Sequence, residues 1–202
     1  MTPTPDISVI IVNLNTRELL DACLASVERE RPEISLEVIV IDNGSEDGSV
    51  EMIQERYPST VLVRNTRNEG FARPNNEGLR RACGRYLLLL NSDTVVRPGA
   101  FHALAGFLDA HPEAGACGPK LVYPDGRLQF SVKGFPTLWT HFCDMTYLDH
   151  VFPGSRLFGR GEMRYFDYER AGTADHLMAA AFLVRRETYA SVGPLDERFA
   201  IY

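Results

Sequence analysis

The sequence predicts an α/β fold with a mostly parallel central sheet flanked by helices, and three observations support this prediction. Short runs of valine, isoleucine and leucine alternate with segments that have helical periodicity. Each run is apolar throughout, which is typical of a parallel strand buried on both faces. Each run also ends in a polar turn, and ligands of such sheets bind outside the carboxyl ends of the strands.

The first half of the chain has the clearest pattern. Strands are expected at residues 8–12, 37–41, 60–63 and 85–90, with helices beginning near residues 15, 48, 70 and 98. Asn15 is expected to cap the first helix, with Glu18 at the reciprocal position of a capping box. The apolar stripe of this helix is expected to contain Leu19, Leu20, Cys23, Leu24 and Val27.

The second half has a weaker pattern. Pro98 is expected to open a helix that His111-Pro112 closes. Further strands are expected at residues 114–123, 128–132 and 175–184, and further helices at residues 138–151 and 186–192. Six aromatic residues in this half are interpreted mainly as core, because large aromatics in a small domain are mostly buried. They are Phe135, Trp139, Phe142, Tyr147, Phe152 and Phe158. The alternatives are an acceptor groove or contact with a membrane surface.

Composition excludes several classes of protein. The net charge of −6 argues against a nucleic-acid partner. The longest apolar run, residues 177–184, is far shorter than the roughly 20 residues of a membrane-spanning helix, so an intracellular, cytoplasmic protein without its own anchor is expected. The four cysteines are too widely spaced for a zinc site or a disulfide framework, and we expect buried free thiols.

The stretch from Arg56 to Arg85 is locally basic, with seven arginines and only two glutamates. Two interpretations remain open for it. The arginines either attract an anionic small ligand or form a solvated helix face.

Asn91 and Asp93 follow the fourth strand, and residues two apart on an extended chain share a face. One carboxylate and one amide make an open site for Mg²⁺ or Mn²⁺, which take one or two protein carboxylates and complete their shell with water and phosphate oxygens. The alternative is that Asp93 caps the next helix or makes an Asx turn with Thr94.

Two other polar turns lie at strand ends. Asp42 either forms the turn of Asp-Asn-Gly or accepts a hydrogen bond from a ligand N–H. In the segment 68–72, Gly70 precedes a helix whose free N–H groups attract anions. There is no Gly-x-Gly-x-x-Gly after the first strand and no Gly-Lys-Ser/Thr loop, which argues against dinucleotide oxidoreductases and P-loop NTPases.

Six segments, taken in order, resemble the family-2 glycosyltransferases with the GT-A (Rossmann-like) fold, particularly the rhamnosyltransferase-like members. They are VIIVNLN, EVIVIDNGSEDGS, RNTRNEGFARPNN, GRYLLLLNSDTVVRPGA, AFLVRRE and VGPLDERF. The resemblance spans nearly the whole chain and implies one domain, residues 1–202, for cell-wall or polysaccharide biosynthesis. Residues 1–97 would be its nucleotide-sugar-binding half, and residues 98–202 a partial acceptor-side half.

The resemblance also implies roles for individual residues. The donor would be a UDP or dTDP sugar, with Asp42 reading the pyrimidine base. Asn91-Ser92-Asp93 occupies the place of the Asp-x-Asp motif, in which Asp93 would hold Mg²⁺ or Mn²⁺ on the diphosphate. The residues implied around the nucleotide are Asn13, Asn15, Asp42, Asn43, Asn68, Gly70, Asn75, Asn91 and Ser92.

The implied reaction is inverting, metal-dependent transfer of a hexosyl group to a saccharide or lipid-linked acceptor. If the protein contacts the membrane peripherally, the transfer would take place at the inner face of the membrane. A carboxylate base must take the proton of the acceptor. In the family a Glu-Asp pair that carries the base follows the segment resembling DERFAIY, whereas this chain ends at Tyr202, so a C-terminally truncated form is expected. Asp175 is the remaining acidic candidate, or a polar residue at a strand edge. Asp196 and Glu197 are expected to be structural, beneath Phe199.

Two departures from the family concern the site itself. Pro74 replaces a small residue in the nucleotide-side helix, and Asn91 replaces an acid, which should weaken metal binding. Two alternative functions stay open, a catalytically idle nucleotide-binding module and a nucleotidyltransferase. The second would need a Gly- and Arg/Lys-rich loop after the first strand, where Asn13-Leu14-Asn15 stands.

Overall fold

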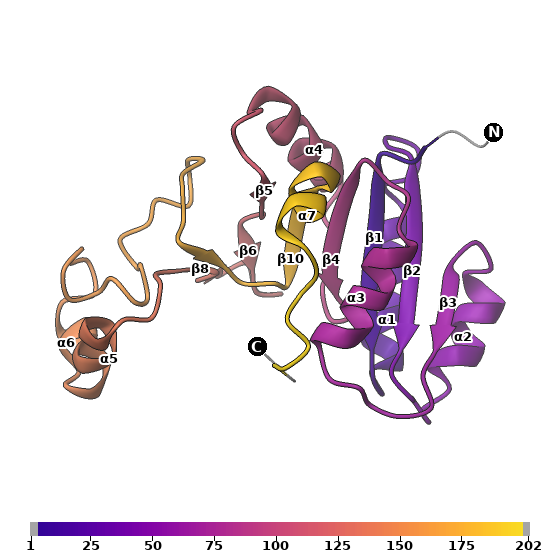
Figure 1. Cartoon of the computed structure of the whole chain (residues 1–202), viewed down its shortest axis with the longest axis horizontal. Helices are drawn as coiled ribbons and strands as arrows, with labels where there is room; N and C mark the ends of the chain where they lie inside the picture. Colours follow the sequence, from indigo (N-terminus) through magenta and orange to yellow (C-terminus); the bar gives the residue numbers. More distant parts are fainter. Residues whose placement is uncertain (1–3, 200–202) are drawn as a thin grey trace. The chain divides into compact units, whose positions relative to one another are not determined.

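The computed structural model describes residues 4–199, which form two compact units (Figure 1). The first, here called the sheet unit, contains residues 4–118 and 179–199. The second unit contains residues 119–178. The expected division into halves at residue 98 stays a prediction.

The sheet unit is built on a six-stranded sheet with the strand order β3-β2-β1-β4-β10-β5. Its strands are β1 (Ile7–Asn13), β2 (Leu36–Asp42), β3 (Val61–Arg64), β4 (Tyr86–Asn91), β5 (Ala116–Cys117) and β10 (Ala181–Arg185). The first four run parallel, and β10 pairs antiparallel with both β4 and β5. The predicted fold class, a mostly parallel sheet flanked by helices, is therefore confirmed.

The helices of the sheet unit are α1 (Arg17–Glu28), α2 (Ser49–Arg56), α3 (Ala72–Arg81), α4 (Ala100–Ala110) and α7 (Arg186–Val192). The contact between α3 and β1 is close, because a Cβ on Gly78 would lie 2.4 Å from Cγ2 of Ile10. Beneath α3, apolar side chains of three strands form the core, among them Ile10, Ile39, Ile41, Leu87 and Leu89. The consecutive leucines of β4 are thus explained by burial on both faces.

Most elements predicted in the first half are confirmed, but the start of α1 is not. Thr16, rather than Asn15, is the N-cap, and no side chain bonds there. Asn15 has a φ of 52° and its side-chain oxygen accepts the N–H of Glu46 (2.8 Å), because a short amide competes for backbone groups of a neighbouring loop. Leu19 is 51% exposed and does not join the buried stripe. The helix expected from Pro98 begins two residues later, after Gly99 with a φ of 79°.

The long strands expected in the second half are wrong. Residues 114–123 and 128–132 yield β5 and three two-residue strands, β6 (Leu121–Val122), β7 (Leu128–Gln129) and β8 (Val132–Lys133). The strand expected at 175–184 is divided between β9 (His176–Leu177) in the second unit and β10 in the sheet unit. The expected helix 138–151 is broken into α5 (Leu138–Met145) and α6 (Leu148–Val151) at Tyr147, which has a φ of 59°.

The aromatic residues of the second unit are mostly exposed, so their interpretation as core is wrong. The exposed fractions are 61% for Phe135, 42% for Trp139, 49% for Phe142, 68% for Tyr147 and 49% for Phe152, while Phe158 is half-buried. The reason is the orientation of α5, which buries Thr140 and Cys143 and turns its apolar residues outward.

Two smaller expectations can be compared with the structure. Cys23, Cys117 and Cys143 are buried free thiols as expected, but Cys83 is exposed. Six of the seven arginines between residues 56 and 85 pair with surface carboxylates, as Arg81 does with Glu77 (3.0 Å) and Arg85 with Asp109 (2.8 Å), which favours the solvated interpretation. No helix in the described part of the chain combines the length and the hydropathy needed to cross a membrane.

Candidate active site

Three polar strand ends lie side by side at one edge of the sheet. The register pairs Asn13 of β1 with Asp42 of β2, and Val12 of β1 with Asn91 of β4. Because neighbouring strands are about 4.8 Å apart, the backbones of Asp42 and Asn91 lie roughly 10 Å apart, on either side of β1. The structure therefore brings the Asp42 turn and the Asn91-Ser92-Asp93 turn to the same edge.

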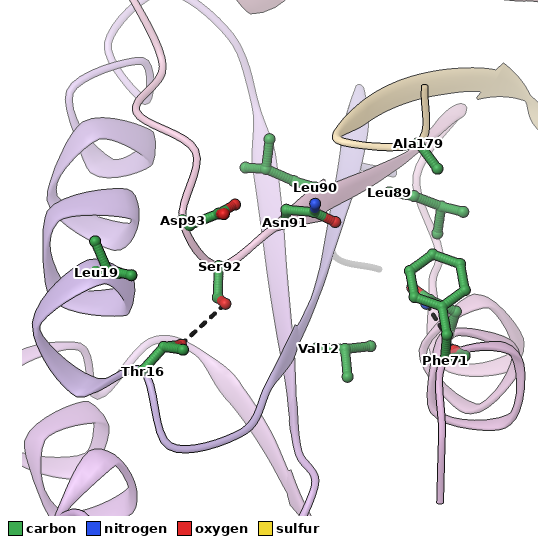
Figure 2. A pocket seen from close by; sticks show the side chains of 11 residues that line it. Val12, Thr16, Leu19, Phe71, Leu89, Leu90, Asn91, Ser92, Asp93 and Ala179 are labelled. Carbon is green, nitrogen blue, oxygen red and sulfur yellow. Dashed lines mark hydrogen bonds between the residues drawn. The ribbon is translucent and has the colours of Figure 1, made fainter. Parts of the chain in front are cut away.

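A cavity of about 210 Å³ opens beside the second of these turns (Figure 2). Its polar lining consists of Thr16, Asn75, Asn91, Ser92 and Asp93, and its apolar lining includes Val12, Leu19 and Phe71. Asn91 and Asp93 are both exposed and both reach it, although through a turn closed by the bond from Thr94 N–H to Asn91 O (3.1 Å) rather than along an extended strand.

The carboxylate of Asp93 is available for a ligand. No described residue donates a hydrogen bond to it, neither Thr94, whose N–H is bonded to Asn91 O, nor Val95, whose N–H would close an Asx turn, so the Asx turn is not formed. Helix α4 is instead capped by Glu30, a buried residue whose carboxylate accepts from Gly99 N (2.9 Å) and Phe101 N (3.1 Å). The alternative in which the side chain of Asp93 makes an Asx turn or caps the next helix is therefore wrong.

The residues at this turn suit a weakly held cation. Within residues 4–199 there is no group of three His, Cys, Asp or Glu side chains that would enclose a metal ion. An open site with one carboxylate and amide and hydroxyl oxygens matches Mg²⁺ or Mn²⁺ that is shared with phosphate. Burial and the nearby charge of Asp93 raise the pKa of the Cys23 thiol to about 12, which keeps this residue, directly beneath the turn, neutral.

Asn13 and Asp42 form the buried part of the edge, being 0% and 2% exposed. The Nδ2 of Asn13 donates to Asp42 Oδ1 and to Ser45 Oγ, both at 3.0 Å. The second oxygen of Asp42 accepts the N–H of Ser45 at 2.9 Å. Each carboxylate oxygen retains acceptor capacity for a ligand N–H, whereas the amide nitrogen of Asn13 is fully used.

Asn43 fastens the loop after β3. Its Nδ2 donates to Asn68 Oδ1 (2.9 Å) and Gly70 O (3.0 Å), and its Oδ1 accepts from Asn65 Nδ2 and Glu69 N, both at 3.1 Å. Asn43 is 2% exposed, so it positions this loop from beneath. Asn68, by contrast, is exposed, and Gly70 has a φ of 81° that favours glycine.

The remaining predicted residues lie in three places. Asn75 lines the cavity, and its Nδ2 donates to Phe71 O (2.8 Å). Asn15 is exposed on the loop before α1. Asp175 belongs to the second unit, where it accepts from Phe135 N (3.4 Å) and lies 3.8 Å from Arg160. Pro74 is tolerated because it stands in the first turn of α3.

The carboxyl-terminal acids are structural, though not in the expected way. Glu197 accepts from Asn76 Nδ2 (3.0 Å), and Asp196 pairs with Arg198 (2.5 Å). Phe199 is 57% exposed, so it does not cover them. The base expected after Tyr202 lies outside the described residues.

Thr16 and Ser45 were missed by the sequence analysis. Thr16 Oγ1 donates to Asn13 Oδ1 (2.7 Å) and lies 3.0 Å from Ser92 Oγ, so it links the ends of β1 and β4. The signal for Ser45 was its place three residues after Asp42, the spacing at which a backbone N–H reaches an aspartate side chain.

Comparisons with known proteins agree with this geometry. The family model described as glycosyl transferase family 2 matches residues 8–187 of this chain. N-acetylglucosaminyl-diphospho-decaprenol L-rhamnosyltransferase of Mycobacterium tuberculosis is 26% identical over 98% of this chain and 67% of its own length. The O-antigen biosynthesis protein RfbC of Myxococcus xanthus is 30% identical over 98% of this chain, which spans only 15% of that protein.

Two solved structures share the fold. The mannosyltransferase PcManGT of Pyrobaculum calidifontis, in complex with GDP-Man and Mn²⁺, has a TM-score of 0.62 at 20% identity, over 97% of this chain and 49% of that one. S. aureus TarS 1-349, in complex with UDP-GlcNAc, has a TM-score of 0.53 at 23% identity, over 67% of this chain and 38% of that one. With the family match over residues 8–187, these findings show that the chain belongs to glycosyl transferase family 2 and has the GT-A type of fold.

Proposed function

We propose that this protein binds a UDP or dTDP sugar with Mg²⁺ or Mn²⁺ and transfers the sugar, with inversion, to a saccharide or lipid-linked acceptor. The observation that carries the proposal is the unbonded, exposed carboxylate of Asp93, which faces a cavity at the sheet edge that also holds Asp42. The relatives named for rhamnosyl transfer and O-antigen biosynthesis support a role in cell-wall or polysaccharide biosynthesis.

The metal side of the site would be formed by Asp93, with the side-chain oxygen of Asn91 beside it. A bound divalent cation supplies stabilisation of the negative charge that develops on the departing diphosphate. Because Asn91 contributes no charge, the cation would be held weakly without the nucleotide. Binding of metal and of nucleotide is therefore expected to be mutually dependent.

The nucleotide side would extend from Asp42 to the loop that Asn43 holds. Asp42 would accept a hydrogen bond from a base N–H, for which its oxygens retain capacity. The exposed Asn68 and the backbone at Gly70 would border the nucleotide, and Asn75 would face it from the cavity wall. Asn15 would border the nucleoside from the loop before α1.

The acceptor side would involve the second unit. Asp175, which is exposed, is the proposed base that takes the proton of the acceptor hydroxyl during a single displacement, unless a residue after Tyr202 does so. The outward apolar face of α5, where Leu138 is 92% and Met145 81% exposed, supports contact with a lipid-linked acceptor at the inner face of the membrane.

Calorimetry with UDP and dTDP, in Mn²⁺, in Mg²⁺ and in EDTA, tests the proposal. We expect binding of at least one nucleotide with metal, and a loss of about 100-fold in Asp93→Asn, because a charged ligand of the cation is removed. Asp144→Asn, which changes an exposed aspartate of α5, is the matched control and should bind normally. Absence of binding for both nucleotides with both metals would contradict the proposal.

A second measurement separates an enzyme from a catalytically idle module. Donor hydrolysis in the presence of Mn²⁺ is expected for the wild-type chain and is expected to be weakened in Asp175→Asn, with nucleotide affinity unchanged. Nucleotide binding without any hydrolysis or transfer would favour the idle module instead.

A further inference from the structure

Two serines at the sheet edge are linked to each other through Asn13, which is buried, and Thr16, which is half-buried. Ser45 follows β2 and Ser92 follows β4, and both are half-buried. Ser45 Oγ lies 3.0 Å from Asn13 Nδ2, and Ser92 Oγ lies 3.0 Å from Thr16 Oγ1. Thr16 and Asn13 are joined in turn at 2.7 Å. The donor and the acceptor in each of these hydrogen bonds can be assigned, starting from the carboxylate of Asp42 to which Asn13 is also bonded.

The direction starts at Asp42, because a carboxylate only accepts hydrogen bonds. The group of Asn13 that lies 3.0 Å from Asp42 Oδ1 must therefore be its NH₂, and this fixes the orientation of the amide. The carbonyl oxygen of Asn13 consequently faces Thr16. Since that oxygen has no hydrogen, Thr16 is the donor in the 2.7 Å bond.

Thr16 has one hydroxyl hydrogen, and its bond to Asn13 uses it. The remaining bond, 3.0 Å between Thr16 Oγ1 and Ser92 Oγ, therefore requires the hydrogen of Ser92. Figure 2 shows this bond at the wall of the cavity that Asp93 also lines. Ser92 Oγ can therefore accept a hydrogen bond from a group in the cavity, or bind a cation there, but it has no hydrogen left to donate.

Ser45 has the opposite hydrogen-bonding capacity, as a donor rather than an acceptor. Its oxygen accepts from Asn13 Nδ2 (3.0 Å) and from the N–H of Asn15 (2.9 Å), which fills both acceptor positions of a hydroxyl. No residue among 4–199 accepts its hydrogen. Ser45 therefore has a hydrogen to donate and no remaining lone pair.

We propose that Asn13 and Thr16 are positioning residues that fix opposite hydrogen-bond polarities at the two serines. Ser92 acts as an oxygen acceptor for the cation at Asp93 or for a water bound to that cation, and Ser45 donates to an oxygen of the nucleotide. The proposal rests on the proposed function, and it assigns two roles that follow only from the direction of the bonds. It predicts that the two serines respond differently to metal.

The cation side is tested by titrating Mn²⁺ into the protein with saturating nucleoside diphosphate, by calorimetry. Ser92→Ala and Thr16→Val are each expected to weaken Mn²⁺ binding about 10-fold, as is usual for residues that support a metal ligand set. Thr16→Ser keeps the hydroxyl and should restore Mn²⁺ affinity to within about twofold of wild type. A purely structural Thr16 would lower thermal stability without changing the Mn²⁺ affinity of the folded protein.

The nucleotide side is tested with Ser45→Ala. The loss of a donor should weaken nucleoside diphosphate binding by about fivefold, and by the same factor in EDTA and in Mn²⁺, because Ser45 does not touch the cation. In Ser92→Ala the loss should appear only with Mn²⁺. This difference between the two serine variants does not depend on the stability of either.

The outcomes distinguish the inference from the function on which it rests. If wild type binds no nucleotide with metal, the proposed function fails. If wild type binds and Ser92→Ala leaves Mn²⁺ affinity within twofold, the inference is overturned, whatever Thr16→Val does. A Ser45→Ala variant whose loss requires Mn²⁺ would also overturn it.

Discussion

The sheet unit and the second unit use their apolar residues in opposite ways. In the sheet unit Val9, Leu88 and Leu183, adjacent on three neighbouring strands, are all 0% exposed. In the second unit Leu138 is 92% and Met145 81% exposed, and each strand is two residues long. The apolar residues of the sheet unit thus form a buried core, whereas these apolar residues of the second unit are exposed to solvent.

Under the proposed function, the two units would have different roles. A rigid edge that positions Asp42 and Asp93 requires strands that are fixed by packing, because buried networks keep one geometry. A surface for an acceptor with an apolar part requires exposed side chains, which contribute little to folding. Stability is therefore expected to be concentrated in the sheet unit.

The largest expected effect is on the core of the sheet unit. Leu88→Ala should lower the free energy of unfolding by about 2–5 kcal/mol, because it opens a cavity in the central strands. Leu138→Ala, the matched change on the exposed face of α5, should alter it by less than about 0.5 kcal/mol. Urea denaturation followed by far-UV circular dichroism measures both.

Trp139 is the single tryptophan of the chain and belongs to the second unit, so its fluorescence reports the unfolding of that unit alone. Leu88→Ala is expected to move the circular dichroism transition and leave the fluorescence transition in place. If both transitions shift together, the two units unfold as one, and the proposed division of stability is wrong.

A smaller effect is expected from the polar anchors of the two units. Asn43→Ala removes the four hydrogen bonds that the buried side chain of Asn43 makes with the loop 65–70, and should cost about 1–3 kcal/mol. Thr137→Ala removes the capping box of α5 and should cost about 1 kcal/mol. Equal costs in thermal denaturation would mean that the second unit is as firmly anchored as the edge.

The same contrast explains how much was predictable from the sequence. The strands of the sheet unit were predictable because each apolar run is buried on both faces, so local composition and environment agree. The exposed face of α5 was not, because an aromatic residue carries no information about the direction in which its helix is turned. The two-residue strands β6 to β9 are too short for any periodicity.

The candidate site was predictable in its residues and not in its bonds. Polar turns after β2 and β4 marked Asp42 and Asp93 directly. The links through Thr16 and Ser45 depend on the register between distant strands, which a single sequence does not show. The cap of α4 is a similar case, since Glu30 reaches it from 69 residues away.

Thiol labelling compares the opening of the two units directly. Cys83 is exposed and should react at once, whereas Cys23 of the sheet unit and Cys143 of the second unit are buried. If stability is concentrated in the sheet unit, Cys143 should react at least about 10-fold faster than Cys23, which corresponds to about 1.4 kcal/mol of opening free energy. Mass spectrometry of peptides after timed labelling gives both rates, and a slower Cys143 would reverse the comparison.

The smallest expected effect is a dependence of the sheet unit on alkaline pH. Tyr57 joins α2 to α1, where its hydroxyl donates to Asp21 Oδ1 (2.6 Å), and burial followed by this bond raises the pKa of Tyr57 to about 12. An unfolded tyrosine loses its proton near pH 10. The contribution to stability is thus complete below pH 10 and is lost as the pH rises to about 12, because only the unfolded state is deprotonated in that interval.

Tyr57→Phe tests this dependence, since it removes the titrating group and keeps the ring. Between pH 10 and 12 the urea midpoint from circular dichroism should fall more steeply in wild type than in Tyr57→Phe, while the Trp139 fluorescence midpoint should fall equally in both. The difference between the two proteins, rather than the fall itself, is the measured quantity, because lysines also titrate in this range. Identical slopes would mean that the bond between Tyr57 and Asp21 does not hold the two helices together.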